Sequence, residues 1–335
     1  MKAIVYTQHG LPIEDPQSLH EQNVPEPAPG PRDLRVKVRA IAVNPVDMKV
    51  RTGSATQGPR ILGWDAVGVV ESVGHAVTLF KPGDEVFYAG SIARPGCYAE
   101  YSVVDERITG HKPHSLSDAE AAALPLTSIT AWELLFDRLG VPEGGGAGQT
   151  LLIVGAAGGV GSILTQIARR LTQLRVIATA SRPQTHQWLL DLGAHDVIDH
   201  SKPLVDELKR IGVERVELVA SLSQTEQHYR QLIEVLAPQG RFALIDDPAT
   251  LDAMPLKRKS ISLHWEMMFT RSLFETPDMQ RQHDILNRVS ELVNAGTIRT
   301  TLAEHFGRID AANLRRAHAL IERGHSRGKI VLEGF

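Results

Sequence analysis

Short apolar runs alternate with amphipathic stretches in the chain from about residue 150 onward. The runs have the length of buried strands, and the stretches between them repeat their apolar residues at helical spacing. The predicted strands cover 150–154, 175–179, 196–198, 216–220, 241–245 and 260–265. The predicted helices cover 159–171, 183–192, 204–211 and 224–236, with a further helix at 278–294. This order predicts an α/β domain with a doubly wound parallel sheet.

The first third of the chain has a different pattern, in which short alternating segments are separated by turn signals. Residues 34–40 alternate apolar and polar side chains, and 68–74 and 84–88 continue this strand pattern. Ser117 and Glu120 then have the spacing of a capping box, which predicts that a helix begins there. A mostly β domain is therefore expected to precede the α/β domain, and the chain closes on a predicted strand at its end.

Composition narrows the classes of function. The chain has 335 residues, enough for two domains, with 42% apolar and 22% charged residues and a formal charge of −3. Its densest basic run is only Lys257, Arg258 and Lys259, so no nucleic-acid or membrane partner is expected. Cys97 is the only cysteine, which excludes an intramolecular disulfide and a cysteine-rich metal site. The first residues lack the apolar stretch of a signal peptide, so a cytoplasmic location is expected.

A glycine-rich turn follows the first strand of the α/β region. Ala156, Gly158 and Gly161 have the spacing of the dinucleotide fingerprint, with alanine in place of its first glycine. Gly158 lets the backbone approach a pyrophosphate, and Gly161 lets the helix pack closely on the strand. The loop, completed by Ala157, Gly159 and Val160, opens a helix whose free N–H groups favour an anion. A dinucleotide site is predicted in preference to an ordinary glycine-rich turn.

The end of the second strand distinguishes between the two nicotinamide dinucleotides. An acid at this place binds the ribose of NAD(H), but residues 177–183 contain none. Ser181 can donate a hydrogen bond and Arg182 can neutralise a phosphate. NADP(H) is therefore favoured as cofactor, with a solvated Arg182 at a helix start as the alternative.

The chain as a whole resembles the medium-chain dehydrogenase/reductase superfamily, in its zinc-free quinone-oxidoreductase-like branch and its zinc-type alcohol dehydrogenase-like subgroup. The segments that carry the resemblance are 42–47, 61–70, 79–86, 124–135, 151–161 and 327–332. It implies a GroES-like β domain of residues 1–125 and 299–335 and a Rossmann NADP(H)-binding domain of residues 126–298. The substrate is then expected in the cleft between the two domains.

The same resemblance argues against a metal. Zinc-containing relatives have a cysteine at the place of Asn44, a histidine at that of Trp64 and a cysteine near Leu126 and Thr127. None of these side chains is a zinc ligand, so no metal site is expected. His111 and His114 have metal-like spacing but lack a third ligand, and surface histidines are the better interpretation.

The resemblance also assigns further site residues. Asn44 is expected to face the nicotinamide and to donate to a substrate oxygen, as the catalytic residue. The expected pocket wall is formed by Lys49, Trp64 and Tyr88, although Trp64 could equally fill core space. Further cofactor contacts are expected from Thr127, Thr130, His200, Ser221, Ile245 and Arg327.

Without a Lewis acid, hydrogen bonds must polarise the carbonyl group. Quinones and α,β-unsaturated carbonyls suit such a site, because hydride addition to them needs only modest stabilisation of an enolate. The predicted function is NADPH-dependent reduction of these compounds. The alternatives are a zinc-dependent alcohol or aldehyde dehydrogenase and an NADPH-binding protein without significant turnover. A homodimer is expected through the edge strand 260–265, unless the basic run before it protects that edge.

Overall fold

The computed structural model describes residues 1–324 and 326–335. Its contacts divide into two units: unit 1 comprises Met1–Ile129 with Phe269–Phe335, and unit 2 comprises Thr130–Met268. The stretch 269–298, which the sequence assigned to the α/β domain, belongs to unit 1. The physical reason is that helix α10 (Arg281–Asn294) packs on strand β8 (Thr109–His111).

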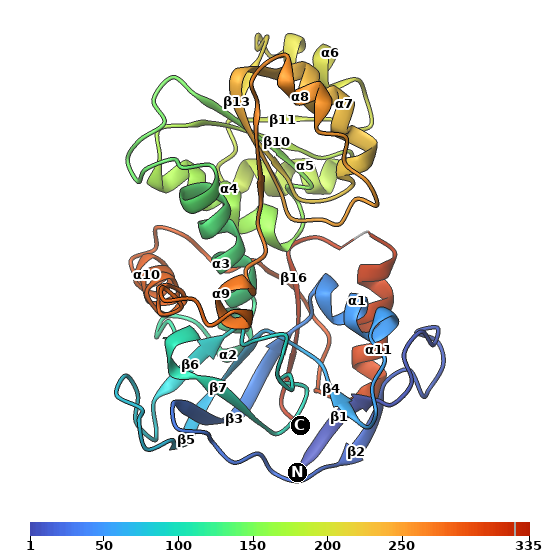
Figure 1. Ribbon diagram of the computed structural model, residues 1–335, viewed down its shortest axis with the longest axis vertical. Helices are drawn as coiled ribbons and strands as arrows, with labels where there is room; N and C mark the ends of the chain where they lie inside the picture. The colour runs from blue at the N-terminus through green and yellow to red at the C-terminus, as the bar shows by residue number, and fades with distance from the viewer. Residues whose placement is uncertain (325) are drawn as a thin grey trace. The chain divides into compact units, whose positions relative to one another are not determined.

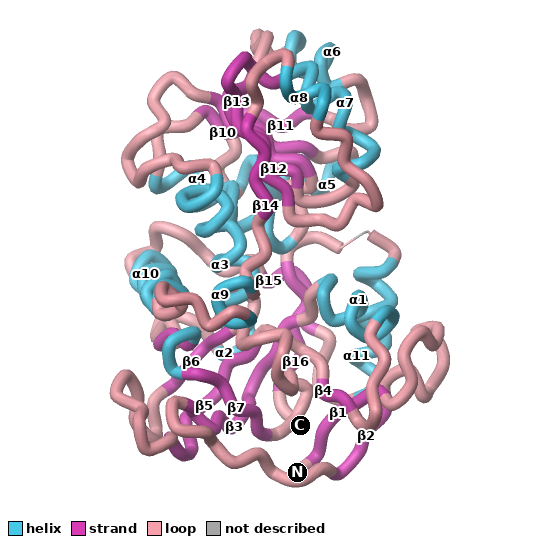
Figure 2. Tube along the Cα trace, in the orientation of Figure 1, coloured by secondary structure: helices cyan, strands magenta, loops and turns pink. Residues whose placement is uncertain are grey.

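Unit 2 contains a six-stranded sheet whose order is β11-β10-β9-β12-β13-β14 (Figure 2). All neighbouring strands in it are parallel. The strands are β9 (Thr150–Val154), β10 (Arg175–Thr179), β11 (Asp196–Ile198), β12 (Val216–Ser221), β13 (Leu236–Leu244) and β14 (Ser262–Trp265). The predicted doubly wound sheet is confirmed, and β14 forms one of its edges.

Helices connect these strands in the predicted places. They are α4 (Gly159–Leu171), α5 (Pro183–Asp191), α6 (Leu204–Arg210), α7 (Thr225–Val235) and the short α8 (Met254–Lys257). Leu152, Ile177 and Phe242 from the sheet are fully buried together with Leu232 of α7. Both faces of this parallel sheet are covered, and this is why the sequences of its strands are continuous apolar runs.

Unit 1 contains two sheets, with strand orders β2-β1-β4 and β15-β16-β3-β5-β6-β8, and β7 pairs with β3 (Figure 1). Their bounds are β1 (Lys2–Tyr6), β2 (His20–Asn23), β3 (Asp33–Ala42), β4 (Arg60–Ile61), β5 (Ala66–Val73), β6 (Glu85–Tyr88), β7 (Tyr101–Asp105), β15 (Leu302–His305) and β16 (Lys329–Glu333). The last strand, β16, pairs with β3, so the C-terminal segment completes a sheet begun near the N-terminus. This pairing is what brings residues of β16 to the site described below.

The helices of unit 1 include two that the sequence pattern did not reveal. These are α1 (Pro45–Gly53) and α11 (Ala311–Glu322), which contact each other. The predicted capping box is present at α2 (Asp118–Ala122), where Ser117 and Glu120 bond reciprocally. A short helix, α9 (Thr270–Leu273), precedes α10.

Helix α3 (Pro125–Trp132) contains the division between the two units and continues into the π-helical turn Glu133–Arg138. Within unit 2, Arg138 of this turn donates to the carboxylate of Glu266, which directly follows β14. No helix within the described residues is long and apolar enough to cross a membrane.

Candidate functional site

The turn between β9 and α4 has the geometry that a dinucleotide pyrophosphate needs. Gly155 has φ +76°, a conformation that glycine adopts without strain. A Cβ at Gly161 would lie 2.4 Å from the Cα and the carbonyl oxygen of Ala156, so only glycine lets helix and turn approach this closely. A Cβ at Gly158 would meet only the Gly155 oxygen at 3.5 Å, which leaves the outer side of the loop open.

The N-terminus of α4 lies directly on this open side. Gly158 is its N-cap, and the first turn of the helix carries no acidic residue. The backbone N–H groups that open a helix have no intrahelical acceptor, and together with the helix dipole they attract an anion. Residues 157–160 are half-buried and so remain partly accessible. The loop therefore fits a dinucleotide phosphate.

Strands β10 and β11 bring further predicted residues to the same edge of the sheet. Thr179 of β10 pairs with Ile198 of β11 in a parallel register, so the residues two positions further along, Ser181 and His200, follow neighbouring strand ends. Ser181 is exposed, and Arg182 is half-buried at the N-cap of α5. This edge is where ligands bind in open parallel sheets.

Two other predicted contacts lie at that edge, Ser221 as the last residue of β12 and Ile245 directly after β13. Ser221 is fully buried, and its hydroxyl lies 2.7 Å from that of Thr225, which in turn donates to Asp246. Its hydroxyl is thus already engaged within the protein. Ile245 is half-buried, and its N–H donates to the Ser221 carbonyl at 3.3 Å.

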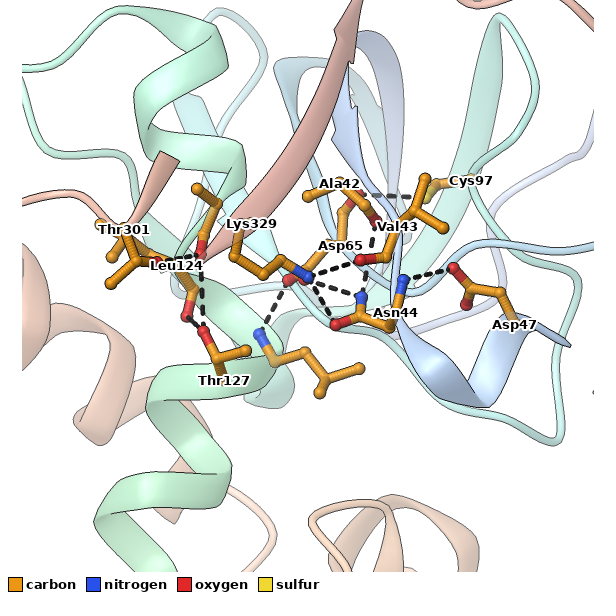
Figure 3. Close-up of polar contacts among 12 residues, drawn as sticks. Ala42, Val43, Asn44, Asp47, Asp65, Cys97, Leu124, Thr127, Thr301 and Lys329 are labelled. Atoms are coloured by element: carbon orange, nitrogen blue, oxygen red, sulfur yellow. Dashed lines mark hydrogen bonds and ion pairs between the residues drawn. The ribbon is translucent and has the colours of Figure 1, made fainter. Parts of the chain in front are cut away.

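In unit 1, Asn44 lies in a buried polar network that connects three distant parts of the chain (Figure 3). Its side-chain Nδ2 donates to Oδ2 of Asp65 at 2.8 Å, and its Oδ1 accepts from Nζ of Lys329 at 2.5 Å. Lys329 also donates to Asp65 at 2.9 Å and to the Val43 carbonyl at 2.9 Å. Both polar ends of the Asn44 amide are therefore occupied.

The network extends beyond Asn44 through Asp47, the third residue of α1. Oδ2 of Asp47 accepts from the Asn44 backbone N–H at 2.8 Å and from the Tyr98 hydroxyl at 2.7 Å. The same hydroxyl lies 3.3 Å from Nε2 of His318, which is fully buried on α11. Burial raises the pKa of Asp47 to about 7 and lowers that of His318 to about 3. Burial also raises the pKa of Asp65, an effect that the Lys329 ammonium opposes.

Trp64 and Tyr88 line one small pocket of unit 1, together with Ser91, Arg94 and Cys97. The Trp64 indole donates to the Ser91 carbonyl at 3.1 Å, and its ring meets Phe269 edge to face at 6.2 Å. The Tyr88 hydroxyl bonds to Ser102, and burial raises its pKa. Lys49, the third predicted wall residue, is exposed on α1 and does not line this pocket.

The remaining predicted contacts are divided between the units. Thr130 is buried at the start of unit 2. Thr127 is buried in unit 1, where its hydroxyl donates back to the Leu124 carbonyl at 3.2 Å. Arg327 is half-buried in unit 1, two residues before β16.

Comparison with known proteins identifies the family to which the chain belongs. A model described as an alcohol dehydrogenase GroES-like domain matches residues 30–114, and one described as a zinc-binding dehydrogenase matches residues 192–332. A zinc-type alcohol dehydrogenase-like protein of Staphylococcus aureus (strain MSSA476) is 41% identical over 331 residues, covering 96% of this chain and 98% of that protein. The chain belongs to the medium-chain dehydrogenase/reductase superfamily, in its zinc-type alcohol dehydrogenase-like group.

Solved structures of this superfamily have the same fold. A protein of Rhizobium etli CFN 42, named as a candidate zinc-dependent alcohol dehydrogenase, is 55% identical, with a TM-score of 0.96, and the match covers 100% of this chain and 98% of that one. The quinone oxidoreductase of Coxiella burnetii is 27% identical, with a TM-score of 0.80 and coverage of 100% and 99%. The predicted combination of a GroES-like domain and a Rossmann domain is confirmed.

Despite the family's designation, the residues at the places where zinc-containing relatives have ligands do not fit a zinc ion. Asn44 is held by Asp65 and Lys329, and the Trp64 indole nitrogen is a donor directed at Ser91. Leu126 has a hydrocarbon side chain, and its backbone N–H donates to Asp65 at 2.8 Å. Among the described residues, no three His, Cys, Asp or Glu side chains form a group that could hold a metal.

Lys329 is a site residue to which the sequence pattern assigns no role. A lysine opening an otherwise apolar strand was a visible signal, but its partner Asp65 is 264 residues away. Tyr98 and His318 were missed for the same reason, because only the folded chain brings them close to Asp47.

Proposed function

We propose that this member of the zinc-type alcohol dehydrogenase-like group reduces quinones or α,β-unsaturated carbonyl compounds with NADPH, without a metal. The observation that carries the proposal is the donor set in unit 1, where the Asn44 amide and the Trp64 indole stand at the places of zinc ligands and the Lys329 ammonium bonds to the amide. A glycine loop suited to a dinucleotide in unit 2 supports the cofactor part.

NADPH would supply the hydride. The loop of residues 157–161 and the N-terminus of α4 would hold its pyrophosphate, and Arg182 and Ser181 would bind its 2′-phosphate. Charged guanidinium–phosphate contacts are among the stronger hydrogen bonds in proteins. This assignment follows from the absence of an acid after β10.

Asn44 would act at the substrate carbonyl. Because one hydrogen of its Nδ2 bonds to Asp65, donation to a substrate oxygen falls to the other hydrogen. Its two hydrogens point to Asp65 at 2.8 Å and, more weakly, to the Ala42 carbonyl at 3.4 Å, and we assign the second hydrogen to the substrate. Lys329, by bonding Oδ1, polarises the amide and strengthens this donor.

The proposed substrate class follows from the weak polarisation that the single Asn44 amide donor can give a carbonyl group. One amide hydrogen bond stabilises an enolate or hydroquinone anion but offers little to an isolated ketone. The likeness to the quinone oxidoreductase of C. burnetii supports the same class.

The test is a steady-state screen of NADPH oxidation with quinones, enones, aldehydes and ketones, each with and without a chelator. We expect turnover of quinones or enones that the chelator does not change. Turnover confined to alcohols and aldehydes, lost with the chelator and restored by zinc, would favour the metal-dependent alternative. Tight NADPH binding without turnover of any class would indicate a cofactor-binding protein.

A further inference from the structure

Two buried glutamates of unit 2 share a single arginine. Glu133 begins the π-helical turn and is fully buried, and Glu266, directly after β14, is 3% exposed. Nε of Arg138 donates to Oε2 of Glu266 at 2.8 Å, and its Nη2 lies 3.9 Å from Oε2 of Glu133. If all three groups were ionised, one negative charge would stay inside the protein without a cation to balance it. Burying such a charge is costly, so the cluster needs a proton.

The two carboxyl groups are also hydrogen-bonded to each other. Oε1 of Glu266 is buried, and no N–H or hydroxyl group among the described residues donates to it. An ionised carboxylate has only acceptor oxygens, so two carboxyl groups can bond to each other only when one of them carries a proton. Burial and the neighbouring Glu133 raise the pKa of Glu266 to about 9, an effect that Arg138 opposes.

The pair joins the two stretches of chain that connect the units. The chain passes from unit 1 to unit 2 after Ile129 and returns after Met268. Glu133 lies just beyond the first crossing, and Glu266 lies just before the second. The bond between their carboxyl groups therefore links both connecting stretches within unit 2. Glu133 also opens a π-helical turn, a rare element that is frequent at functional sites.

Few other charges lie on the elements around the pair, and α3 carries none. Besides Arg138 they are Asp137 of the π-helical turn, His264 of β14 and Arg241 of β13. Asp137 is exposed to solvent. Burial lowers the pKa of His264, as do the two arginines, so its ring is neutral above pH 7. Arg241 donates to the Leu139 carbonyl. A proton is therefore what balances the second carboxylate of the pair.

We propose that Glu133 and Glu266 share one proton and form a latch between the two connecting stretches, which opens when the proton leaves at alkaline pH. The proposal does not depend on the proposed function. With the proton in place, the carboxyl groups bond to each other and Arg138 balances the remaining charge. When hydroxide takes the proton, two carboxylates face each other in a buried place, and their repulsion favours a state in which water reaches them.

The latch makes stability depend on pH in one direction. The ordinary pKa of a glutamate, 4.5, applies to the unfolded chain, whereas Glu266 of the folded protein ionises near pH 9. Between these values only the folded state holds the proton. The contribution of Glu266 to stability therefore falls as pH rises and levels off above about pH 9.

The first measurement is the Tm of the full chain from pH 6 to 10, compared with that of Glu266→Gln. The new amide can donate to Glu133 and still accept from Arg138, so this variant imitates the protonated latch at every pH. Its Tm relative to the parent should rise up to about pH 9 and then level off. Glu133→Gln should behave in the same way. Glu214→Gln, at an exposed glutamate before β12, is the matched control and should show a constant difference.

The second measurement is hydrogen–deuterium exchange at pH 7 and pH 9.5, with rates corrected for the intrinsic effect of pH on exchange. In the parent, peptides covering 130–139 and 262–268 should lose protection at the higher pH. In Glu266→Gln the same peptides should keep it. Peptides from the buried strand β9 should stay protected in both proteins and serve as the internal reference.

The two measurements separate the proton from the latch. A Tm difference that stays constant from pH 6 to 10 would overturn the shared proton. A Tm difference that changes while peptides 130–139 and 262–268 keep their protection would overturn the latch, as would a loss of protection that includes β9. If Glu266→Gln does not fold, Glu133→Gln provides both readouts.

Discussion

The chemistry of unit 1 depends on individual residues that neutralise one another inside the protein. Asp65 and Lys329 are both buried, with side chains 0% and 3% exposed, and they share Asn44 between them. A buried ion pair adds little net stability, but removing one member leaves the other charge without compensation. The pair is thus better understood as fixing the position of Asn44 than as a source of stability.

Replacing Lys329 tests this account. Lys329→Met should lower the free energy of unfolding by about 3–5 kcal/mol, because Asp65 is then buried without its compensating charge. Asp65→Asn combined with Lys329→Met should recover more than half of that loss. Denaturant titration gives both values, and Lys81→Met, which breaks an exposed pair with Asp84, is the control with an expected change below about 1 kcal/mol. Equal losses in the single and double variants would contradict an uncompensated charge as the cause.

Arg182 tests the cofactor assignment. Arg182→Ala should weaken NADPH binding by roughly an order of magnitude or more and leave NADH binding almost unchanged, because only NADPH carries the 2′-phosphate. Fluorescence titration with each cofactor measures the two affinities. Arg170→Ala, at an exposed arginine in the last turn of α4, serves as control. Equal weakening of both cofactors would show that Arg182 does not bind the phosphate.

Asp47 should make stability depend on pH. Its folded pKa of about 7 lies above the ordinary 3.8, so the folded state holds the proton more tightly and the contribution of Asp47 to stability falls as pH rises between these values. Asp47→Asn removes this titration, and its amide oxygen can still accept from Asn44 and Tyr98. Relative to the parent, the Tm of the variant should therefore be higher at pH 8 than at pH 5. A difference in Tm that stays constant across this range would refute the raised pKa.

At the scale of elements, the strands and helices of the α/β part could be predicted closely. The length of the apolar runs, the helical spacing of the stretches between them and the regular order of strand and helix all indicate the same fold there. All six strands of unit 2 were predicted, with ends displaced by a few residues at β13, where the strand begins at Leu236. Helices α1 and α11 were missed for a different reason. Helix α1 buries Asp47 and Arg51 beside its apolar residues, so its inner face does not form an apolar stripe. The inner face of α11 carries a single leucine, two alanines and His318, which makes its apolar stripe weak.

The glycine loop gives a prediction at this scale, because two of its glycines serve different ends. Gly161→Ala should destabilise the protein, since its Cβ would meet the Ala156 backbone at 2.4 Å. Gly158→Ala has room within the protein and an ordinary φ of −72°, so its Tm should stay close to that of the parent. Its methyl group would nevertheless occupy the open side of the loop and weaken dinucleotide binding. Paired Tm and NADPH-affinity measurements check both, and loss of stability with Gly158→Ala alone would reverse the assignment.

At the scale of the whole molecule, the sequence indicated candidate site residues but not their hydrogen-bond partners. It named Asn44, Trp64 and the fingerprint as site residues but not the residues that bond to them. It could not show that Lys329 of the final strand reaches Asn44, nor that the hydroxyl of Ser221 bonds to Thr225. Such contacts depend on strand order, and β16 pairs with β3 across nearly the entire chain. The segment 269–298 was assigned to the wrong neighbour for the same reason, since its helix pattern does not reveal which sheet it packs on.

Assembly is the last property that the fold suggests. Strand β14 is an edge of the unit 2 sheet, and Trp265 and Met267 beside it are 52% and 48% exposed. An edge strand with exposed apolar side chains can pair with another chain, and a twofold axis would join two such sheets. We expect a homodimer at micromolar concentration by light scattering. Trp265→Glu with Met267→Glu should yield a monomer with little change in Tm, whereas Met254→Glu, at a 67% exposed residue of α8, should remain a dimer. A parent protein that is already monomeric would show that the basic run Lys257–Lys259 protects this edge, and a dimer that survives the double substitution would place the interface elsewhere.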